Sequence, residues 1–345
     1  MRKALPWLLF AVILALVGFK LRSSHFDWSG FAHICRTANL GYLALAALVI
    51  NSNNILRALR WSIFLRPAYR VTAVPHTPWQ RLIGSQFIGF TGLAIFGRVG
   101  ELIRPLLVAR RTQLSFPSQV AVVAVERLFD LVAFALLFSC NLLISPQLQA
   151  LPYLHRAGYS IAALTAAIAI FVLGVRLAGA TLARIASRLL QPFSPTLATA
   201  AHSKILAFRH GLNVIDTFAD FALTALLSLT LWITIAFAYL LVLKAFPAPV
   251  HALNLSHVLV LMGFSIAGSA LPIPGGSGAW AGNVFALTTL LGIPSELAVG
   301  AGLMVWLITT LSVVPAGLVC ARLEGVSLTQ LTGSGKAQEN SATTA

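Results

Sequence analysis

The chain has 345 residues, of which 58% are hydrophobic and 10% are charged, and its formal net charge is +15. Apolar runs of the length of a membrane helix recur from end to end, which excludes a soluble globular protein and indicates a polytopic membrane protein. The basic residues cluster between the apolar runs and form no separate basic domain. Retention of Lys and Arg on the cytoplasmic side produces this pattern, which argues against nucleic-acid binding.

About six segments are long enough to cross a hydrocarbon core of about 30 Å as helices. The first follows the basic start MRK and lacks a small-residue cleavage pattern, so we interpret it as a retained crossing and not as a signal peptide. The predicted crossings are residues 5–19, 40–65, 116–144, 159–178, 220–246 and 296–320.

Two further apolar regions are interrupted in the middle. In the first region, the motif FGRVG separates a leg at 82–96 from a leg at 100–111. In the second, the motif PIPGGSG separates a leg at 258–271 from a leg at 279–291. Each leg is about 20 Å long as a helix, too short to span alone. Each pair is therefore either a re-entrant hairpin or one broken helix that crosses.

Loop charge favours the hairpins. If they return, both termini and the long loop at about 179–219 lie in the cytoplasm, whereas a crossing places this loop outside, against the positive-inside rule. We expect the loop to form short amphipathic pieces on the cytoplasmic surface. Its basic residues include Arg184, Arg188, Lys204 and Arg209.

The two interrupted regions resemble each other, because each ends in a proline–serine pair that opens the next crossing, at Pro117 and at Pro294. We expect one transmembrane domain over residues 1–325, with halves of about 1–150 and 151–325, and a disordered cytoplasmic tail at 326–345. Each half contains three crossings and one hairpin, so the second half is inverted. The predicted fold is all-α with two re-entrant hairpins in an inverted repeat, as in transporters.

The stretch LPIPGGSGAW, residues 271–280, breaks the second region with two prolines and three glycines. Non-helical backbone at membrane depth is tolerated only where protein buries it or water wets it. One interpretation is a stretch that lines a cavity, with the free N–H groups at Gly278 directed toward an anion. The other is a structural kink satisfied by neighbouring helices, since Pro and Gly are common in membrane helices.

Three of the nine acidic residues, Glu101, Glu126 and Asp130, fall in or beside membrane segments. Glu126 and Asp130 are four residues apart and share a helix face. A charge at the bilayer centre costs about 2.5–3.5 kcal/mol on insertion scales, so these groups must find partners inside the bundle. They form either a polar relay or head-group site, or a structural ion-pair knot. The candidate partners are Arg98, Arg104 and Arg127.

The second crossing carries a polar stripe within an arc of roughly 120°. The stripe points inward, and it either takes part in the polar site or serves for interhelical hydrogen bonds, with arginines that snorkel to the cytoplasmic boundary. For Arg60 both interpretations stay open. The stripe consists of Asn53, Asn54, Arg57, Arg60 and Trp61.

Enzyme motifs find little support. GGSG at 275–278 has the serine setting of an intramembrane protease, but the last histidine, His257, lies upstream of Ser277 and no later base follows. The histidines form no H-x-x-x-H pair, the three cysteines are far apart, and no P-loop is present. We therefore expect no catalytic residues, no metal and no cofactor.

Four motifs together resemble the flippase-like family that includes the transmembrane region of lysylphosphatidylglycerol synthase/flippase. The motifs are LRALRW (56–61), GRVGELIRPLL (97–107), VERLFD (125–130) and LPIPGGSG (271–278). The resemblance implies a helical membrane fold with re-entrant segments that moves lipids or lipid-linked molecules between leaflets. Many members carry a glutamate after the glycine turn where this chain has Ala281, and the aminoacyl-transferase domain does not follow. Synthesis of lysyl-lipid is therefore not expected.

The leading hypothesis is a lipid flippase of the cytoplasmic membrane, in which Arg98, Arg104 and the helix start at Gly278 hold phosphate. The alternatives are an intramembrane enzyme on lipid-linked phosphate or sugar, and a non-transporting assembly factor. Expected partners are an anionic phospholipid, a hopanoid or a polyprenyl-linked lipid; a homo-oligomer and a lipid-modifying enzyme partner stay open. The candidate substrate-binding residues are Asn54, Arg57, Arg98, Gly100, Glu101, Arg104, Glu126, Arg127, Asp130, Pro274, Gly275, Gly276, Ser277 and Gly278.

Overall fold

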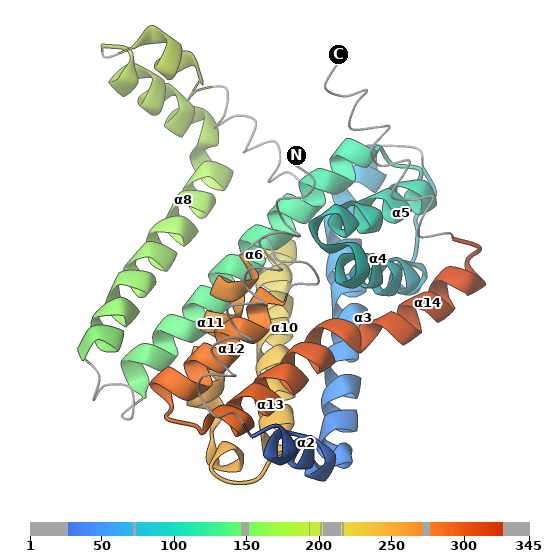
Figure 1. The fold of residues 1–345 in the computed structure, drawn as a ribbon. Helices are drawn as coiled ribbons and strands as arrows, with labels where there is room; N and C mark the ends of the chain where they lie inside the picture. The colour runs from blue at the N-terminus through green and yellow to red at the C-terminus, as the bar shows by residue number, and fades with distance from the viewer. Residues whose placement is uncertain are drawn as a thin grey trace, which may run out of the picture. The chain divides into compact units, whose positions relative to one another are not determined.

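A computed structural model gives the architecture (Figure 1). It describes residues 27–71, 74–145, 152–192, 194–200, 202, 215, 217–270 and 277–326. Within these ranges every regular element is a helix and no strand occurs, which confirms the predicted all-α class. The first predicted crossing, at 5–19, lies outside the described residues, and so does nearly all of the predicted tail.

The helices follow the interrupted apolar pattern of the sequence. The α-helices are α2 Trp28–Thr37, α3 Leu40–Val71, α4 Ile83–Phe96, α5 Ile103–Thr112, α6 Phe116–Ile144, α8 Pro152–Leu190, α10 Phe218–Lys244, α11 Leu255–Ser269, α12 Gly278–Phe285, α13 Ser295–Trp306 and α14 Val313–Leu323. The short elements are the 3₁₀ helices η1 Trp79–Leu82, η2 Gly97–Leu102 and η3 Val250–Ala252 and the π-helical segments η5 Ala286–Leu290 and η6 Leu307–Leu311.

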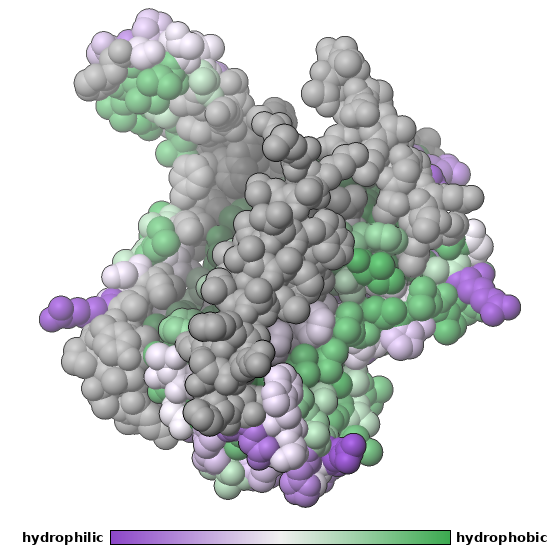
Figure 2. Space-filling view, viewed as in Figure 1, coloured by the Kyte–Doolittle hydropathy of each residue, from purple (hydrophilic) through white to green (hydrophobic). Residues whose placement is uncertain are grey.

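Three helices in the described part of the chain are long and apolar enough to cross a membrane: Leu40–Val71, Phe218–Lys244 and Ser295–Leu323. They coincide with the crossings predicted at 40–65, 220–246 and 296–320. The last of them combines α13, η6 and α14, and apolar side chains cover the visible face of α14 (Figure 2). The chain is therefore a multi-pass membrane protein, while the full count of crossings and the inverted repeat stay predictions.

The predicted crossing at 159–178 is part of a longer helix. Helix α8 runs over 39 residues from Pro152 to Leu190, about 58 Å at 1.5 Å per residue. The loop predicted from about 179 was therefore wrong over its first twelve residues. The basic and apolar residues there continue one helix, because no Gly or Pro interrupts the chain between Ala180 and Leu190.

The described chain forms two compact units, each with its own internal contacts. Unit 1 contains residues 1–57, 83–107 and 233–345, and unit 2 contains residues 58–82 and 108–232. Helices α3, α5 and α10 contribute residues to both units. The two units are described separately below.

In unit 1, the chain turns back after α4 so that the following segment packs on it. A Cβ on Gly100 would lie 2.1 Å from the backbone oxygen of Gly92, so only glycine permits this approach. In the turn that follows Gly100, Ile103 faces Gly92 and Arg104 faces Gly89. The return of this first hairpin is as predicted, and its depth in the membrane stays a prediction.

The second hairpin of unit 1 has the same construction. Helices α11 and α12 lie side by side (Figure 1), and a Cβ on Gly268 or on Gly282 would lie 2.1 Å from a backbone oxygen of the opposite helix. The oxygens belong to Gly278 and Phe264 respectively. Glycines therefore bring the two legs into backbone contact in both hairpins. Residues 271–276 of the turn lie outside the described residues.

Helices α13 and α14 make further contacts within unit 1. Helix α14 packs on α4, where Gly317 lies against Thr91 and the Thr91 hydroxyl donates to the carbonyl of Val313 at 3.3 Å. Helix α13 packs between α12 and α2, and the Trp280 indole donates to the carbonyl of Val299 at 3.4 Å. The first hairpin is thus held by the last crossing helix of the chain.

In unit 2, helix α6 lies beside α8 and contacts α10 through aromatic rings. Phe129 meets Phe221 with ring centroids 5.4 Å apart, and Phe134 meets Trp232 at 4.8 Å. Because later residues of α6 meet later residues of α10, the two helices run parallel here. This arrangement sets the register of the charged side chains that α6 carries.

Candidate functional site

The most concentrated polar cluster of the described structure lies in unit 2, around the guanidinium of Arg60 on α3. Its Nη1 donates to Oδ1 of Asp130 and to Oγ of Ser228, each at 2.6 Å. Its Nη2 donates to Oε1 of Glu126 at 2.6 Å and to Oδ2 of Asp130 at 3.3 Å. One arginine therefore joins two carboxylates on α6 to a hydroxyl on α10.

This cluster, which we call the Arg60 network, is shielded from solvent. Arg60 is 0% exposed, Glu126 1% and Asp130 6%. Buried charges are tolerated only when they are paired and hydrogen-bonded, and removing one partner costs about 3–5 kcal/mol because the others stay buried. The network therefore fixes α3, α6 and α10 of unit 2 against one another.

The local sequence explains why these groups converge. Glu126 and Asp130 are one helical turn apart, so both carboxylates leave the same face of α6. The Ser228 hydroxyl donates to the carbonyl of Thr224 at 2.8 Å, which leaves its oxygen free to accept from Arg60. The helix that carries each of these side chains therefore already orients it toward Arg60.

Neighbouring side chains hold the α3 face in register. The indole Nε1 of Trp61 donates to Oε1 of Gln119 at 3.0 Å, and both residues are about 1% exposed. One turn from Arg60, the ring of Phe64 packs on Phe129 with centroids 6.4 Å apart. An aromatic contact and a buried hydrogen bond therefore flank the ionic contacts on the same two helices.

The expected partners of Glu126 were incomplete, because Arg60 was not among them. Arg127 follows Glu126 in the chain but is exposed, since neighbours on a helix point about 100° apart. Arg104 belongs to unit 1, and the side chain of Arg98 lies outside the described residues. The polar stripe of the second crossing did contain Arg60. The interhelical hydrogen bonds of the second interpretation are present, but Arg60 does not snorkel, because it is 0% exposed.

Sequence reasoning also missed a second ion pair of unit 2. Arg66 on α3 donates to Oδ1 of Asp220 at 2.5 Å, and the Thr217 hydroxyl donates to Oδ2 of Asp220 at 2.9 Å. The side chain of Arg66 is 47% exposed and that of Asp220 6%. Asp220 lies in the first turn of α10, where a carboxylate favours the helix start, and this preference was the available signal.

A different arginine arrangement lies in unit 1, on the first hairpin. The guanidinium carbons of Arg57 and Arg104 lie 4.6 and 5.1 Å from the ring centre of Phe90 on α4. Nη1 of Arg104 also donates to Oε1 of Gln86 at 3.3 Å, and Arg104 is only 4% exposed. We call Arg57, Gln86, Phe90 and Arg104 the hairpin cluster. It contributes two cations to a membrane-embedded unit.

Glycine permits this cluster to form. Gly89 stands opposite Arg104, and a Cβ at Gly89 would lie 2.5 Å from the Arg104 Cβ and 3.0 Å from its Cα. Without a side chain at Gly89, α5 approaches α4 closely enough for Arg104 to reach Phe90 and Gln86. Cation–π contacts contribute about 2 kcal/mol when desolvated, so the ring stabilises the buried guanidinium.

The remaining predicted site residues divide between the two units and the undescribed turn. Asn54 is 5% exposed and donates to the carbonyl of Asn51 at 3.2 Å, and Glu101 is partly exposed in η2. Ser277 and Gly278 open α12. Pro274, Gly275 and Gly276 lie outside the described residues. The structure thus groups Arg57 with Arg104 and Glu126 with Asp130.

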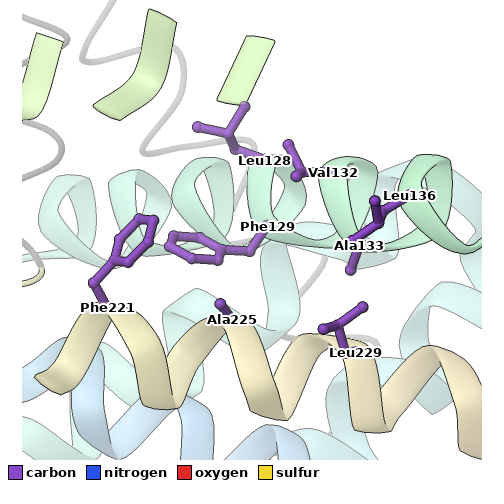
Figure 3. A pocket seen from close by; sticks show the side chains of 8 residues that line it. All are labelled: Leu128, Phe129, Val132, Ala133, Leu136, Phe221, Ala225 and Leu229. Atoms are coloured by element: carbon purple, nitrogen blue, oxygen red, sulfur yellow. The ribbon is translucent and has the colours of Figure 1, made fainter. Parts of the chain in front are cut away.

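An apolar groove lies beside the Arg60 network in unit 2 (Figure 3). Its cavity volume is about 120 Å³. Phe129 and Phe221 face each other at one end, and Leu136 and Leu229 lie at the other (Figure 3). The lining residues are Leu128, Phe129, Val132, Ala133, Leu136, Phe221, Ala225 and Leu229.

Comparison with known proteins places the chain in a family. The family model described as the lysylphosphatidylglycerol synthase TM region matches residues 4–317. The chain is also 31% identical over 126 residues to glycosyltransferase AglD of Haloferax volcanii, covering 36% of this chain and 19% of that protein. The chain thus spans about a fifth of the length of that relative. No solved structure matches the chain. The chain belongs to the family of the lysylphosphatidylglycerol synthase transmembrane region.

Proposed function

We propose that the protein moves anionic lipids, or lipid-linked phosphates, between the leaflets of the cytoplasmic membrane. The observation that carries the proposal is the hairpin cluster, in which Arg104 is 4% exposed and shares Phe90 with Arg57. A phosphate that leaves the head-group region needs hydrogen-bond donors inside the protein, and a guanidinium supplies them in a planar fork. Membership in a family named for a phospholipid synthase supports this choice of substrate class.

The two arginine sites take different parts in this proposal. The hairpin cluster receives the head group, while the Arg60 network keeps its helices together as the head group passes. Arg57 and Arg60 lie three residues apart on α3, so a shift of this helix acts on both. The acyl or isoprenoid chains stay in lipid throughout. Both termini lie in the cytoplasm, as the loop charges predict.

A reconstituted assay tests the proposal. Vesicles that contain the purified protein and a fluorescent phosphatidylglycerol are treated with a membrane-impermeant quencher, which reports how fast the inner-leaflet lipid becomes accessible. Arg104→Ala should slow this rate about tenfold or more, because a hydrogen bond to a charged group contributes about 1.5–3 kcal/mol. Arg36→Ala is the matched control, since Arg36 is an exposed arginine of unit 1.

Two comparisons sharpen the assay. Arg104→Lys keeps the charge but loses the planar fork, so it should restore only part of the rate. A fluorescent phosphatidylcholine should move more slowly than phosphatidylglycerol if an anionic head group is the substrate. Transport by Arg104→Ala at the wild-type rate would exclude this role of the hairpin cluster.

A second candidate function is chemistry on a lipid-linked sugar, which the partial likeness to glycosyltransferase AglD favours. We propose that the chain is not itself an enzyme. In the part of the chain that the structure describes, the buried polar groups include no serine–histidine pair that could supply a nucleophile and its base. Product formation from a polyprenyl-phosphate sugar in detergent, without vesicles, would favour the enzyme. Activity that requires two leaflets would favour transport.

A further inference from the structure

The apolar groove of unit 2 has the features of a hydrocarbon-binding site. It is lined by α6 and α10, and its three α10 residues, Phe221, Ala225 and Leu229, recur every four positions along a helix that is apolar enough to span a membrane. All eight lining side chains are apolar. At this depth the surrounding solvent is lipid, so a hydrocarbon chain is the group that fills such a cavity at the lowest cost.

The groove has a direction relative to the membrane boundary. Phe221 lies in the first turn of α10, and Leu229 lies about 12 Å further along it at 1.5 Å per residue. The groove therefore runs from the start of the span toward its middle, as the chain of a lipid does in one leaflet. Aromatic contacts join its two walls: Phe129 meets Phe221 at one end, and Phe134 meets Trp232 near the other.

A charged group marks the boundary end of the groove. Asp220, next to Phe221, pairs with Arg66, and the side chain of Arg66 is 47% exposed. Arginine side chains at the ends of membrane helices reach the interface and attract anionic head groups. The start of α10 thus carries, at neighbouring positions, the first α10 residue that lines the groove and the carboxylate that holds a half-exposed guanidinium. This combination suits an amphiphile with a hydrocarbon chain and an anionic head.

The groove also touches the Arg60 network. Phe129 lines the groove between Glu126 and Asp130 in the sequence, and its ring packs on Phe64, one turn from Arg60. Ser228, which accepts from Arg60, lies between the lining residues Ala225 and Leu229 on α10. A hydrocarbon chain in the groove would therefore contact α6 and α10, two of the three helices that the network joins.

We infer that this groove binds the hydrocarbon chain of an anionic lipid from the leaflet in which α10 begins, with the phosphate at Arg66. This site uses other residues than the hairpin cluster and goes beyond the proposed transport, since it is a binding site whether or not the lipid crosses. The two lipids that share the required chemistry are a diacyl phospholipid and a polyprenyl phosphate.

Photo-crosslinking tests this inference without a transport readout. The protein is placed in vesicles of phosphatidylethanolamine that contain a trace of phosphatidylglycerol with a diazirine in its acyl chain, and crosslinked peptides are mapped by mass spectrometry. We expect crosslinks concentrated at 128–136 and 221–229 that unlabelled phosphatidylglycerol competes away. Competition by a polyprenyl phosphate at lower concentration would identify the isoprenoid as the preferred chain.

Variants that fill the groove provide the controls. Ala225→Trp should lower these crosslinks at least fivefold, whereas Leu226→Trp, at a neighbouring position that is 61% exposed, should leave them unchanged. If Ala225→Trp does not fold, Leu229→Phe is the milder filling variant. Arg66→Gln should weaken competition by the anionic lipid while keeping the groove open.

Three results would overturn the inference. Crosslinks spread evenly over exposed apolar residues such as Leu45 and Leu48 would show ordinary contact with bulk lipid. Crosslinks that Ala225→Trp leaves unchanged would show that the chain does not enter the groove. An absence of crosslinks at α6 and α10 would show that something other than lipid covers the groove.

Discussion

The two arginine sites use the same functional group in opposite ways. In unit 2, Arg60 is 0% exposed and donates to two carboxylates and a hydroxyl on two other helices. In unit 1, Arg104 is 4% exposed, lies over the ring of Phe90 and donates to the neutral amide of Gln86. Strong ionic bonds hold the first arginine, whereas the partners of the second include a ring and a neutral amide.

This difference indicates that one arginine stabilises the fold and that the other binds the lipid head group. A guanidinium that is already divided between carboxylates is a poor ligand for a phosphate, because the phosphate would have to displace buried anions. A guanidinium that lies over a ring is held through its face, while its planar fork of N–H donors lies at its edge, the geometry in which arginine binds phosphate. We therefore assign stability to the Arg60 network and head-group binding to the hairpin cluster, and the variants below test that division.

Arg60→Leu should have the largest effect on folding. It leaves Glu126 and Asp130 buried without their guanidinium, which costs about 3–5 kcal/mol and should lower the yield of folded protein and its melting temperature in detergent. The measurement is thermal unfolding beside Arg36→Ala, which should stay within about 0.5 kcal/mol of the wild type.

Replacing all three groups sharpens this test. The triple variant Arg60→Leu, Glu126→Leu, Asp130→Leu removes the whole network, and a well-packed apolar replacement is often neutral or stabilising. We expect it to recover much of the lost melting temperature. A triple variant as unstable as Arg60→Leu would show that the loss does not come from uncompensated buried charge.

Gly100→Ala should come next, because it acts on the backbone that supports the hairpin cluster. The added Cβ would lie 2.1 Å from the oxygen and 2.2 Å from the carbon of Gly92, so the hairpin must open, at a cost of about 3 kcal/mol. Gly97→Ala is the comparison. Gly97 has φ +64°, and nothing lies within 4 Å of the added Cβ, so this variant should lose only about 1–2 kcal/mol of unfolding free energy. Equal losses, measured by thermal unfolding, would argue against close packing of the legs.

Arg66→Ala should have the smallest effect on stability. Its side chain is 47% exposed, and the Thr217 hydroxyl still donates to Asp220 after the change. Exposed ion pairs contribute about 1 kcal/mol or less, and salt screens them. If the melting temperature falls as far as in Arg60→Leu, the Arg66–Asp220 pair stabilises the protein as much as the Arg60 network does, which would contradict this account.

Much of the fold follows from local sequence. The interruptions FGRVG and PIPGGSG predicted where the two apolar regions turn. At Gly100 only glycine allows the two legs to meet at backbone distance, and Gly97 has a positive φ of 64°. The apolar runs likewise predicted α3, α6, α10 and the final crossing. The length of α8 did not follow, because its last twelve residues mix basic and apolar types in a pattern that an interfacial piece also has.

The sequence predicted many of the residues of the candidate site, but it did not predict which of them contact one another. The helix periodicity placed Glu126 and Asp130 on one face and Arg57 and Arg60 on another. It could not show that Arg60, 66 residues from Glu126, is the partner, nor that Arg57 and Arg104 share Phe90. Such pairings depend on tertiary packing between helices far apart in the chain.

The division between the two arginine sites is tested most directly by lipid movement in Arg104→Ala. Its rate of phosphatidylglycerol movement in vesicles is measured beside the wild type, together with its melting temperature. The account predicts a folded protein whose rate falls about tenfold or more. A folded Arg104→Ala protein that moves the lipid as fast as the wild type would contradict it.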